Sequence, residues 1–484
     1  MTIEVLPLGV QCNLRCQYCY QNQERDSGHT HLAYDLDAMK AALAAEGGEF
    51  TIFGGEALLM PKADLEDLWA WGFERYGHNG VQTNGSLIDD DHIRMFRDYN
   101  VSVGVSVDGP GELNDARWVG SLQTTREATA KTQANIERLC AEGMAPSLII
   151  TLTRANASAD KLPRMSAWLR DLDRRGVPAA RLHTLEVETA EIGEHYALTV
   201  EETVAAMRRL SALEQQLSMK FDLFGDIEQL QLLNDDAMTC TFAACDPYTT
   251  SAVQGVGPRG QRSNCGRAHK EGVDHVKAGT PGFERYLALH NTPQARGGCS
   301  GCRFFAMCKG QCPGTAVSGD WRQRTSECSL WKELFRASET SLLSRGVLPL
   351  SLRPERKAIE AALLQAWAQG ENPTLESIAR TLGFAPIAVD LKREQARRAG
   401  EPTEVPSDPV PLPDFVRMSW ASDTARELWQ GRLEQIQRMR IDVALHQAAV
   451  QSICRPLLLL PAELMGLRSP PASANSGSRS VTSG

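Results

Sequence analysis

Hydrophobic positions over residues 1–190 follow two alternating patterns. Six short runs rich in β-branched and aromatic residues are typical of buried strands, and they occupy residues 3–10, 49–54, 80–85, 101–107, 145–152 and 180–188. Amphipathic stretches with helical spacing separate them, for example at residues 34–46, 62–77 and 159–176. Strands that alternate with helices favour a parallel sheet with right-handed crossovers. The pattern therefore predicts an α/β fold in which a partial (β/α)6 TIM-like barrel occupies residues 1–220.

The pattern changes after this barrel. Residues 221–335 show little regular periodicity, are rich in glycine and hold eight cysteines, so we expect a module built around metal sites rather than a large apolar core. Residues 336–400 return to helical spacing and predict a helical C-terminal extension. A proline-rich linker and a last helix are predicted within residues 401–468, and the small polar residues 469–484 predict a disordered tail.

Four distinctive stretches follow the first four predicted strands. The motif CxxxCxxC follows the first strand, Gly-Gly-Glu the second, Thr-Asn-Gly-Ser the third and Ser-Val-Asp-Gly-Pro the fourth. Because the carboxyl ends of parallel strands meet at one rim of a barrel, we expect these stretches to lie together. Three cysteines can hold a [4Fe–4S] cluster by three of its irons, which leaves the fourth iron open to a substrate or cofactor.

Composition narrows the class of protein. With 484 residues, 42% hydrophobic and 23% charged, the chain resembles an ordinary soluble protein, and its net charge of −9 offers no basic field for nucleic acid. The N-terminal residues lack a signal-peptide pattern, and the apolar run at 455–467 is too short and broken to span a bilayer. Thirteen cysteines in such a chain favour metal ligation over disulfides, so we expect a reducing, cytoplasmic location and no membrane partner.

The motifs at the barrel rim resemble those of the radical S-adenosylmethionine (radical SAM) superfamily. The resemblance implies that three cysteines hold one [4Fe–4S] cluster: Cys12, Cys16 and Cys19. S-adenosylmethionine would chelate the open iron through its methionine amine and carboxylate. The residues that would bind this cofactor are Tyr18 beside the adenine, Gly54, Gly55 and Glu56 at the amino group, and Asn84, Ser106 and Asp108 at the next strand ends. One departure from the family pattern is Ala57, where proline is usual.

The second cysteine set resembles the SPASM extension of radical SAM enzymes, which carries auxiliary iron–sulfur clusters. The resemblance assigns one auxiliary [4Fe–4S] cluster to Cys299, Cys302, Cys308 and Cys328, and another to Cys240, Cys245, Cys265 and Cys312. Three clusters are then expected in total. The spacing by itself also suits one or two zinc sites. Cys140 and Cys454 remain, and we interpret them as buried thiols.

The resemblance implies a radical SAM oxidoreductase that generates a 5′-deoxyadenosyl radical and abstracts hydrogen from a peptide or protein side chain. The product would be a crosslink, a thioether or an oxidised residue, and the reductant a flavodoxin or ferredoxin. In the sulfatase-maturing branch a carboxylate follows the equivalent of Cys265, whereas here the residue is Gly266, and Asp246 is a speculative catalytic substitute. The alternatives are a radical SAM enzyme for a small molecule and, in another class, a zinc-stabilised helix-turn-helix regulator.

The segment 373–398 resembles a helix-turn-helix. Thr374 would cap a first helix, Gly383 would turn the chain, and a second helix from Val389 would end in basic residues. Three interpretations stay open: a helical subdomain packed on the core, a peptide-holding module, and a nucleic-acid reader, which the acidic chain disfavours. For His29, His31 and His183, hydrogen bonding or packing is expected rather than ligation.

Overall fold

The computed structural model describes residues 3–28, 33–246, 254–263, 265, 267 and 282–384. Several predicted features lie outside these residues: the second helix of the helix-turn-helix-like segment with its basic end, the linker and last helix at 401–468, the tail at 469–484, and His29, His31, Gly266 and Cys454.

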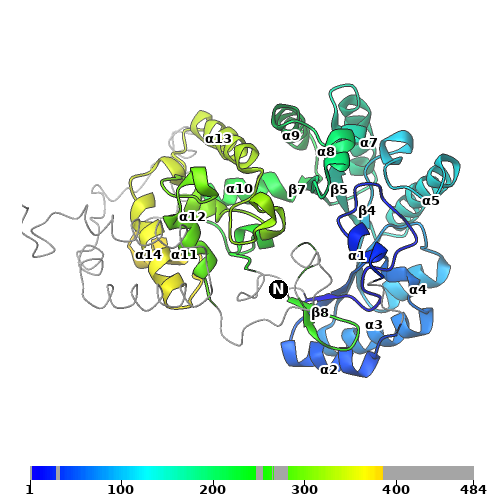
Figure 1. Ribbon diagram of the computed structural model, residues 1–484. Helices are drawn as coiled ribbons and strands as arrows, with labels where there is room; N and C mark the ends of the chain where they lie inside the picture. The colour runs from blue at the N-terminus through cyan, green and yellow to red at the C-terminus, as the bar shows by residue number, and fades with distance from the viewer. Residues whose placement is uncertain are drawn as a thin grey trace, which may run out of the picture.

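Within the described residues, one nine-stranded sheet organises the fold, in the order β7-β6-β5-β4-β3-β2-β1-β8-β9. All neighbouring strands are parallel except β8 and β9, which pair antiparallel. Because the order begins at β7 and ends at β9, the sheet is an unclosed partial barrel (Figure 1). The strands are β1 Ile3–Val5, β2 Phe50–Ile52, β3 Asn79–Thr83, β4 Val101–Ser106, β5 Ser147–Leu152, β6 Ala179–Thr184, β7 Lys220–Phe221, β8 Gln254–Val256 and β9 Arg262–Ser263.

The helices fall into two groups (Figure 1). One group follows the strands of the sheet: α1 Asn22–Asp26, α2 Leu36–Glu46, α3 Lys62–Tyr76, α4 Asp90–Asp98, α5 Leu122–Ala141, α6 Arg154–Ala157, α7 Leu162–Arg174, α8 Ala190–Tyr196 and α9 Val200–Glu214. Of these, α2, α3, α4, α5 and α7 cover the outer side of the sheet, whereas α1 lies in the loop that follows β1. The other group builds the cysteine-rich part and the helical extension: α10 Asp222–Gln231, α11 Glu284–Asn291, α12 Phe305–Cys308, α13 Cys328–Ser344, α14 Arg356–Ala368 and α15 Leu375–Thr381.

The six predicted strands are confirmed as β1 to β6, and each is followed by at least one helix. Most side chains of β3 and β4 are buried, whereas buried and partly exposed side chains alternate along β5. One face of the sheet is therefore covered more completely than the other. The first strand is shorter than predicted, because the chain leaves the sheet after Val5 and turns at Gly9, whose φ is +56°. The early departure forms the cysteine loop above the end of β1.

Three short strands extend the sheet beyond the predicted six. The parallel partners of β1 are β2 on one side and β8 on the other, with Ile3 opposite Phe50 and opposite Gln254. At the other edge β7 pairs with β6. Residues from the predicted cysteine-rich module therefore belong to the same sheet as the barrel, and the boundary predicted near residue 220 falls within β7.

The cysteine-rich part has an aromatic core that continues into the helical extension. Phe335 in α13 stacks on Phe304 with ring centroids 5.1 Å apart, and Trp367 in α14 lies 5.1 Å from Tyr286 in α11. Phe335 and Trp367 are both wholly buried. The boundary predicted at residue 335 falls inside α13, so this helix belongs to both predicted regions. The two regions consequently share one core.

The short helix α15 is fixed at its start by two side chains. Thr374 accepts a hydrogen bond from the Ser377 amide, which confirms the predicted cap, and the Asp235 carboxylate accepts from the amides of Leu375 and Glu376 at 2.8 and 3.1 Å. This arrangement docks the helical extension on the loop that follows α10. Among the described residues, no helix combines the length and apolarity needed to cross a membrane.

Candidate functional site

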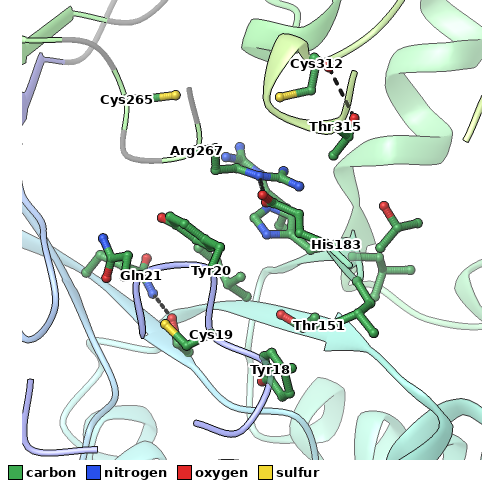
Figure 2. Close-up of a pocket in the computed structure, with 18 of the residues that line it drawn as sticks. Tyr18, Cys19, Tyr20, Gln21, Thr151, His183, Cys265, Arg267, Cys312 and Thr315 are labelled. Atoms are coloured by element: carbon green, nitrogen blue, oxygen red, sulfur yellow. Dashed lines mark hydrogen bonds and ion pairs between the residues drawn. The ribbon is translucent and has the colours of Figure 1, made fainter. Parts of the chain in front are cut away.

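A cavity of about 300 Å³ lies at the carboxyl ends of the barrel strands. Its walls come from the cysteine loop after β1, from the ends of β2 to β6, and from five stretches of the cysteine-rich part, which begin at residues 222, 239, 265, 311 and 327. Figure 2 shows Cys19 and Tyr18 toward one side, Cys265 and Cys312 toward the other, and Tyr20, His183 and Arg267 between them. The two cysteine sets that the sequence separates by more than two hundred residues therefore face one space.

The cysteine loop gathers three thiols at the barrel rim. Cys12, Cys16 and Cys19 all line the cavity. Burial, together with the neighbouring thiols of Cys19 and Cys12, raises the pKa of Cys16 to about 12. The loop backbone is held against the chain after β4, because the Arg15 and Gln17 amides each donate at 2.8 Å to carbonyls of residues 116–118. The three sulfur atoms are thus held in one place by a constrained loop.

The Gly-Gly-Glu turn packs directly against the cysteine loop. The Gly55 amide donates to the Gly9 carbonyl at 3.0 Å, and the Glu56 amide donates to the Gln11 carbonyl at 2.8 Å. A Cβ atom on Gly55 would lie 2.1 Å from the Gln11 carbonyl oxygen, and Gly54 has a φ of +129°. Only glycine permits both features. Gly54 and Gly55 therefore expose bare backbone to the cavity, which they line.

The Glu56 side chain lies behind the cavity wall. Its carboxylate accepts hydrogen bonds from the Thr83 hydroxyl at 2.7 Å, the Asn84 amide at 2.8 Å and the Leu58 amide at 3.0 Å. The side chain is 1% exposed and is not among the residues that line the cavity. Glu56 therefore joins the ends of β2 and β3, and its direct contact with a cofactor amino group stays a prediction.

Asp108 has a similar position behind the wall. Its carboxylate accepts from the Tyr18 hydroxyl, from Arg117 Nη2 at 3.0 Å and from the Thr151 amide at 3.0 Å. Tyr18 and Arg117 line the cavity, whereas Asp108 does not. Asp108 thus orients two cavity residues and joins the ends of β4 and β5.

The remaining predicted cofactor residues do line the cavity. Asn84 donates from Nδ2 to Asn13 Oδ1 at 2.7 Å, which connects the end of β3 to the cysteine loop. Ser106 Oγ accepts from Gln82 Nε2 at 2.8 Å at the ends of β4 and β3. Their roles toward a cofactor stay predictions, but both face the space beside the three thiols.

Four of the predicted auxiliary cysteines line a second, smaller cavity. Its wall includes all four sulfur atoms of the first predicted set and a layer of aromatic rings, and its main members are Cys299, Cys302, Cys308, Cys328, Phe304, Phe305, Trp331 and Phe335. Burial raises the pKa of Cys299 well above its ordinary value, and the other three thiols raise it further. Four thiols around one dry space match the ligand set of a [4Fe–4S] cluster.

The other predicted set faces the main cavity. Cys240, Cys265 and Cys312 line it, while Cys245 is 8% exposed and lies behind them. Burial raises the pKa of Cys265 well above its ordinary value, with contributions from Glu4, from Cys245 and from the other two thiols. In the described part of the chain, no three His, Cys, Asp or Glu side chains converge on a point that one metal ion could occupy. The soft sulfur donors of these thiols fit iron–sulfur clusters.

Asp246, the speculative catalytic residue, is 1% exposed and does not line the main cavity. The carboxylates that do line it are Glu4, Glu186, Asp222 and Glu327. Glu186 forms an ion pair with Arg267, and Glu327 accepts from the Thr184 hydroxyl at 2.8 Å. Burial raises the pKa of Glu327. These carboxylates are therefore better placed than Asp246 to accept a proton from a substrate.

The residues in the middle of the cavity were not predicted from the sequence to belong to the site. Tyr20, His183 and Arg267 lie between the two cysteine sets (Figure 2). Burial lowers the pKa of His183 well below its ordinary value, and Arg267, Arg181 and Arg117 lower it further, so its imidazole is neutral. Proximity to cysteine was the one available signal, because Tyr20 follows Cys19 and Arg267 lies two residues after Cys265. His183 carried no such signal.

Comparison with known proteins supports the resemblance of the barrel to radical SAM enzymes. Residues 6–154 match the family model described as the Radical SAM superfamily. The serine-type anaerobic sulfatase-maturating enzyme of Bacteroides thetaiotaomicron is 34% identical over 128 residues, which span 23% of this chain and 30% of that protein. The chain thus covers less than a third of that relative. An uncharacterised protein of Archaeoglobus fulgidus matches over a longer stretch: it is 25% identical, and the match spans 72% of this chain and 83% of that protein.

A solved structure matches over a longer stretch. "Native anSMEcpe with bound AdoMet and Cp18Cys peptide" has a TM-score of 0.57 and 17% identity, and the match spans 71% of this chain and 98% of that chain. At this identity the likeness concerns the fold. It extends beyond the barrel, since the matched share of this chain exceeds that of residues 6–154.

Proposed function

We propose that this chain, whose residues 6–154 match the Radical SAM superfamily, abstracts a hydrogen atom from a side chain of a peptide or protein during the maturation of that molecule. One observation carries the proposal. The cysteine loop and the wall formed by Cys240, Cys265 and Cys312 line the same cavity, so a substrate between them would contact both halves of the site. The proposed products are a crosslink, a thioether or an oxidised residue.

S-adenosylmethionine with a reduced [4Fe–4S] cluster supplies, when bound, the ability to remove hydrogen from an unactivated C–H bond. The protein holds and orients the reactants. Cys12, Cys16 and Cys19 would ligate the cluster, and the exposed backbone of Gly54 and Gly55 would accept the cofactor at close range. Tyr18 is kept in one orientation by its hydrogen bond to Asp108, so its ring would form a fixed wall beside a bound cofactor.

The middle of the cavity would bind the substrate. The Glu186–Arg267 ion pair, the neutral His183 and the Glu327 carboxylate surround the space between the proposed clusters. These groups can donate to and accept from the amide groups of a peptide while apolar side chains exclude water. A peptide substrate is further supported by the names of the similar proteins, one a sulfatase-maturating enzyme and the other described with a bound peptide.

The remaining partners belong to the same proposal. In the part of the chain that the structure describes, the cysteines are free thiols, which suits a reducing cytoplasm and a flavodoxin or ferredoxin as reductant. Zinc in a helix-turn-helix regulator receives no support from the comparisons, because the matched family is that of the radical SAM enzymes.

The experiment is anaerobic reconstitution of the full chain, followed by measurement of iron and of 5′-deoxyadenosine. We expect about twelve irons per chain in the wild-type protein, as three four-iron clusters. Changing Cys12, Cys16 and Cys19 together to Ala should remove about four irons and abolish 5′-deoxyadenosine formation. The matched control is Cys140→Ala, because this half-buried cysteine in α5 lines neither cavity. Full 5′-deoxyadenosine formation in the triple variant would refute the proposal.

The substrate class is tested by isotope transfer. Peptides encoded beside the gene of this chain would be made with deuterated side chains and incubated with enzyme, reductant and S-adenosylmethionine. Deuterium in the 5′-deoxyadenosine identifies a peptide as the hydrogen donor. Deuterium transfer from a small metabolite fraction and from none of the peptides would instead favour a small-molecule substrate.

A further inference from the structure

The segment from Cys308 to Cys312 joins the two cysteine-lined cavities. Cys308 lines the smaller cavity, whereas Gln311 and Cys312 line the main one. Only three residues, 309–311, therefore separate a proposed ligand of one auxiliary cluster from a proposed ligand of the other. Any side chain in this segment lies close to both sites.

The backbone of this segment is held in an uncommon conformation. Lys309, Gly310 and Gln311 have φ angles of +50°, +75° and +60°. Residues other than glycine rarely adopt such angles unless surrounding contacts impose them. Here the Gly310 carbonyl accepts from the Thr325 amide at 2.9 Å, and the Gln311 carbonyl accepts from Arg285 Nη2 at 3.2 Å. The direction in which the Gln311 side chain leaves the backbone is consequently fixed.

The Gln311 side chain is buried without a hydrogen-bond partner among the described residues. The residue is 2% exposed, and neither Oε1 nor Nε2 has a protein partner of good geometry. Buried amides are almost always satisfied, so an orphaned one indicates a missing group. The Gln311 backbone amide donates to the Cys308 carbonyl at 3.0 Å, so the side chain leaves a tight turn between Cys308 and Cys312. Within this segment, the one polar side chain without a partner thus lies between two proposed cluster ligands.

We propose that Gln311 donates a hydrogen bond from its side-chain amide to cluster sulfur at the junction of the two auxiliary sites, and thereby raises the reduction potential of the cluster that accepts it. The inference rests on the ligand sets in the proposed function. A reduced cluster carries more negative charge than an oxidised one, so a donor to its sulfur stabilises the reduced form more. Gln311 would in this way favour electron uptake at an auxiliary cluster.

The test is a redox titration of the reconstituted full chain, followed by electron paramagnetic resonance. The variant is Gln311→Met, which has nearly the same volume and no amide. At the wild-type midpoint potential, the reduced-to-oxidised ratio of one auxiliary signal should fall at least threefold, which corresponds to about 28 mV for a one-electron couple. The matched control is Gln231→Met, because Gln231 in α10 is equally buried and lines neither cavity.

Iron content separates the possible failures. If wild-type protein binds only about four irons, the auxiliary clusters of the proposed function are absent. If Gln311→Met keeps all its iron and both auxiliary midpoints are unchanged, the role of Gln311 is wrong. If that variant loses iron, wild-type protein labelled with ¹⁵N-glutamine is measured instead. Pulsed electron paramagnetic resonance should detect ¹⁵N coupled to a reduced auxiliary cluster. A spectrum without this coupling would overturn the inference.

Discussion

Arg117 Nη2 lies 3.0 Å from Asp108 Oδ1, and both side chains are almost wholly buried, Arg117 at the wall of the main cavity and Asp108 behind it. Asp108 also accepts from Tyr18 of the cysteine loop and from the Thr151 amide at the end of β5. A single carboxylate therefore connects the cysteine loop, the chain after β4 and the end of β5. We therefore expect Asp108 to stabilise the fold of the barrel rim.

Replacing Asp108 with Ala should destabilise the protein by about 3–5 kcal/mol, because it leaves a buried guanidinium without its counter-charge. The measurement is anaerobic denaturant unfolding. The matched control is Asp115→Ala, which removes the partner of Arg126 in an exposed pair and should cost less than about 1 kcal/mol. If the Asp108 variant kept its stability but lost affinity for S-adenosylmethionine, Asp108 would be a direct cofactor ligand after all.

Changing Cys299 and Cys302 together to Ser should remove about four irons and leave 5′-deoxyadenosine formation measurable. The reason is spatial, since these cysteines line the smaller cavity and the three cysteines of the N-terminal loop line the main one. Formation of modified substrate should fail if the auxiliary cluster takes part in turnover. An unchanged product yield with four irons missing would assign that cluster a purely structural role.

Trp367→Ala should cost about 3–5 kcal/mol and lower the auxiliary iron content, although Trp367 lies outside the cysteine-rich segment in the sequence. Its ring stacks on Phe283 at 6.2 Å and contacts Phe305 at 6.0 Å, and Phe305 lines the smaller cavity. Iron analysis and thermal unfolding measure the two effects. Leu343→Ala in α13 is the control, because that side chain is exposed, and it should change neither quantity. Full iron in the Trp367 variant would mean that the extension folds independently of the cluster sites.

Glu24→Gln should make the protein more stable above pH 7 and have little effect near pH 4.5. Burial raises the pKa of Glu24 from 4.5 to about 7, and Oε1 has no hydrogen-bond partner among the described residues. The folded state therefore binds this proton more tightly than the unfolded state, so wild-type stability is lost as the pH rises from about 4.5 to 7. The predicted gain at pH 8 is about 1–3 kcal/mol.

Unfolding midpoints at pH 5 and pH 8 check the Glu24 prediction. Glu74→Gln is the control, because Glu74 is exposed on α3. The effect of this substitution on stability should be the same at both pH values. Equal stability of wild type and Glu24→Gln at pH 8 would contradict the prediction and would mean that water reaches this carboxylate.

Local spacing in the sequence was enough to identify the parts of the site that lie close together along the chain. The CxxxCxxC loop brings its three thiols together because its few residues leave little freedom. Cys299 and Cys302 are likewise brought together by a short spacing, and the six short apolar runs predicted β1 to β6 through their periodicity. These features depend on neighbours in sequence, so pattern alone determines them.

The tertiary structure decided which side chains face the cavity. Glu56 and Asp108 stand in motifs typical of cofactor sites, yet the fold directs both carboxylates to backbone amides and hydroxyls behind the wall. His183 and Arg267 reach the cavity from segments more than eighty residues apart. No local pattern reports such convergence, because it depends on strand order and on the angle at which each chain leaves the sheet.

By itself, then, the sequence predicted the fold class and the resemblance to radical SAM enzymes, because periodicity and short spacings encode local structure. Only the tertiary structure revealed that β8 pairs with β1, since that pairing joins segments more than two hundred residues apart. Only the tertiary structure revealed the buried amide of Gln311 between the two cysteine-lined cavities. A side chain without a partner is a property of everything packed around it, and that packing comes from segments distant in the sequence.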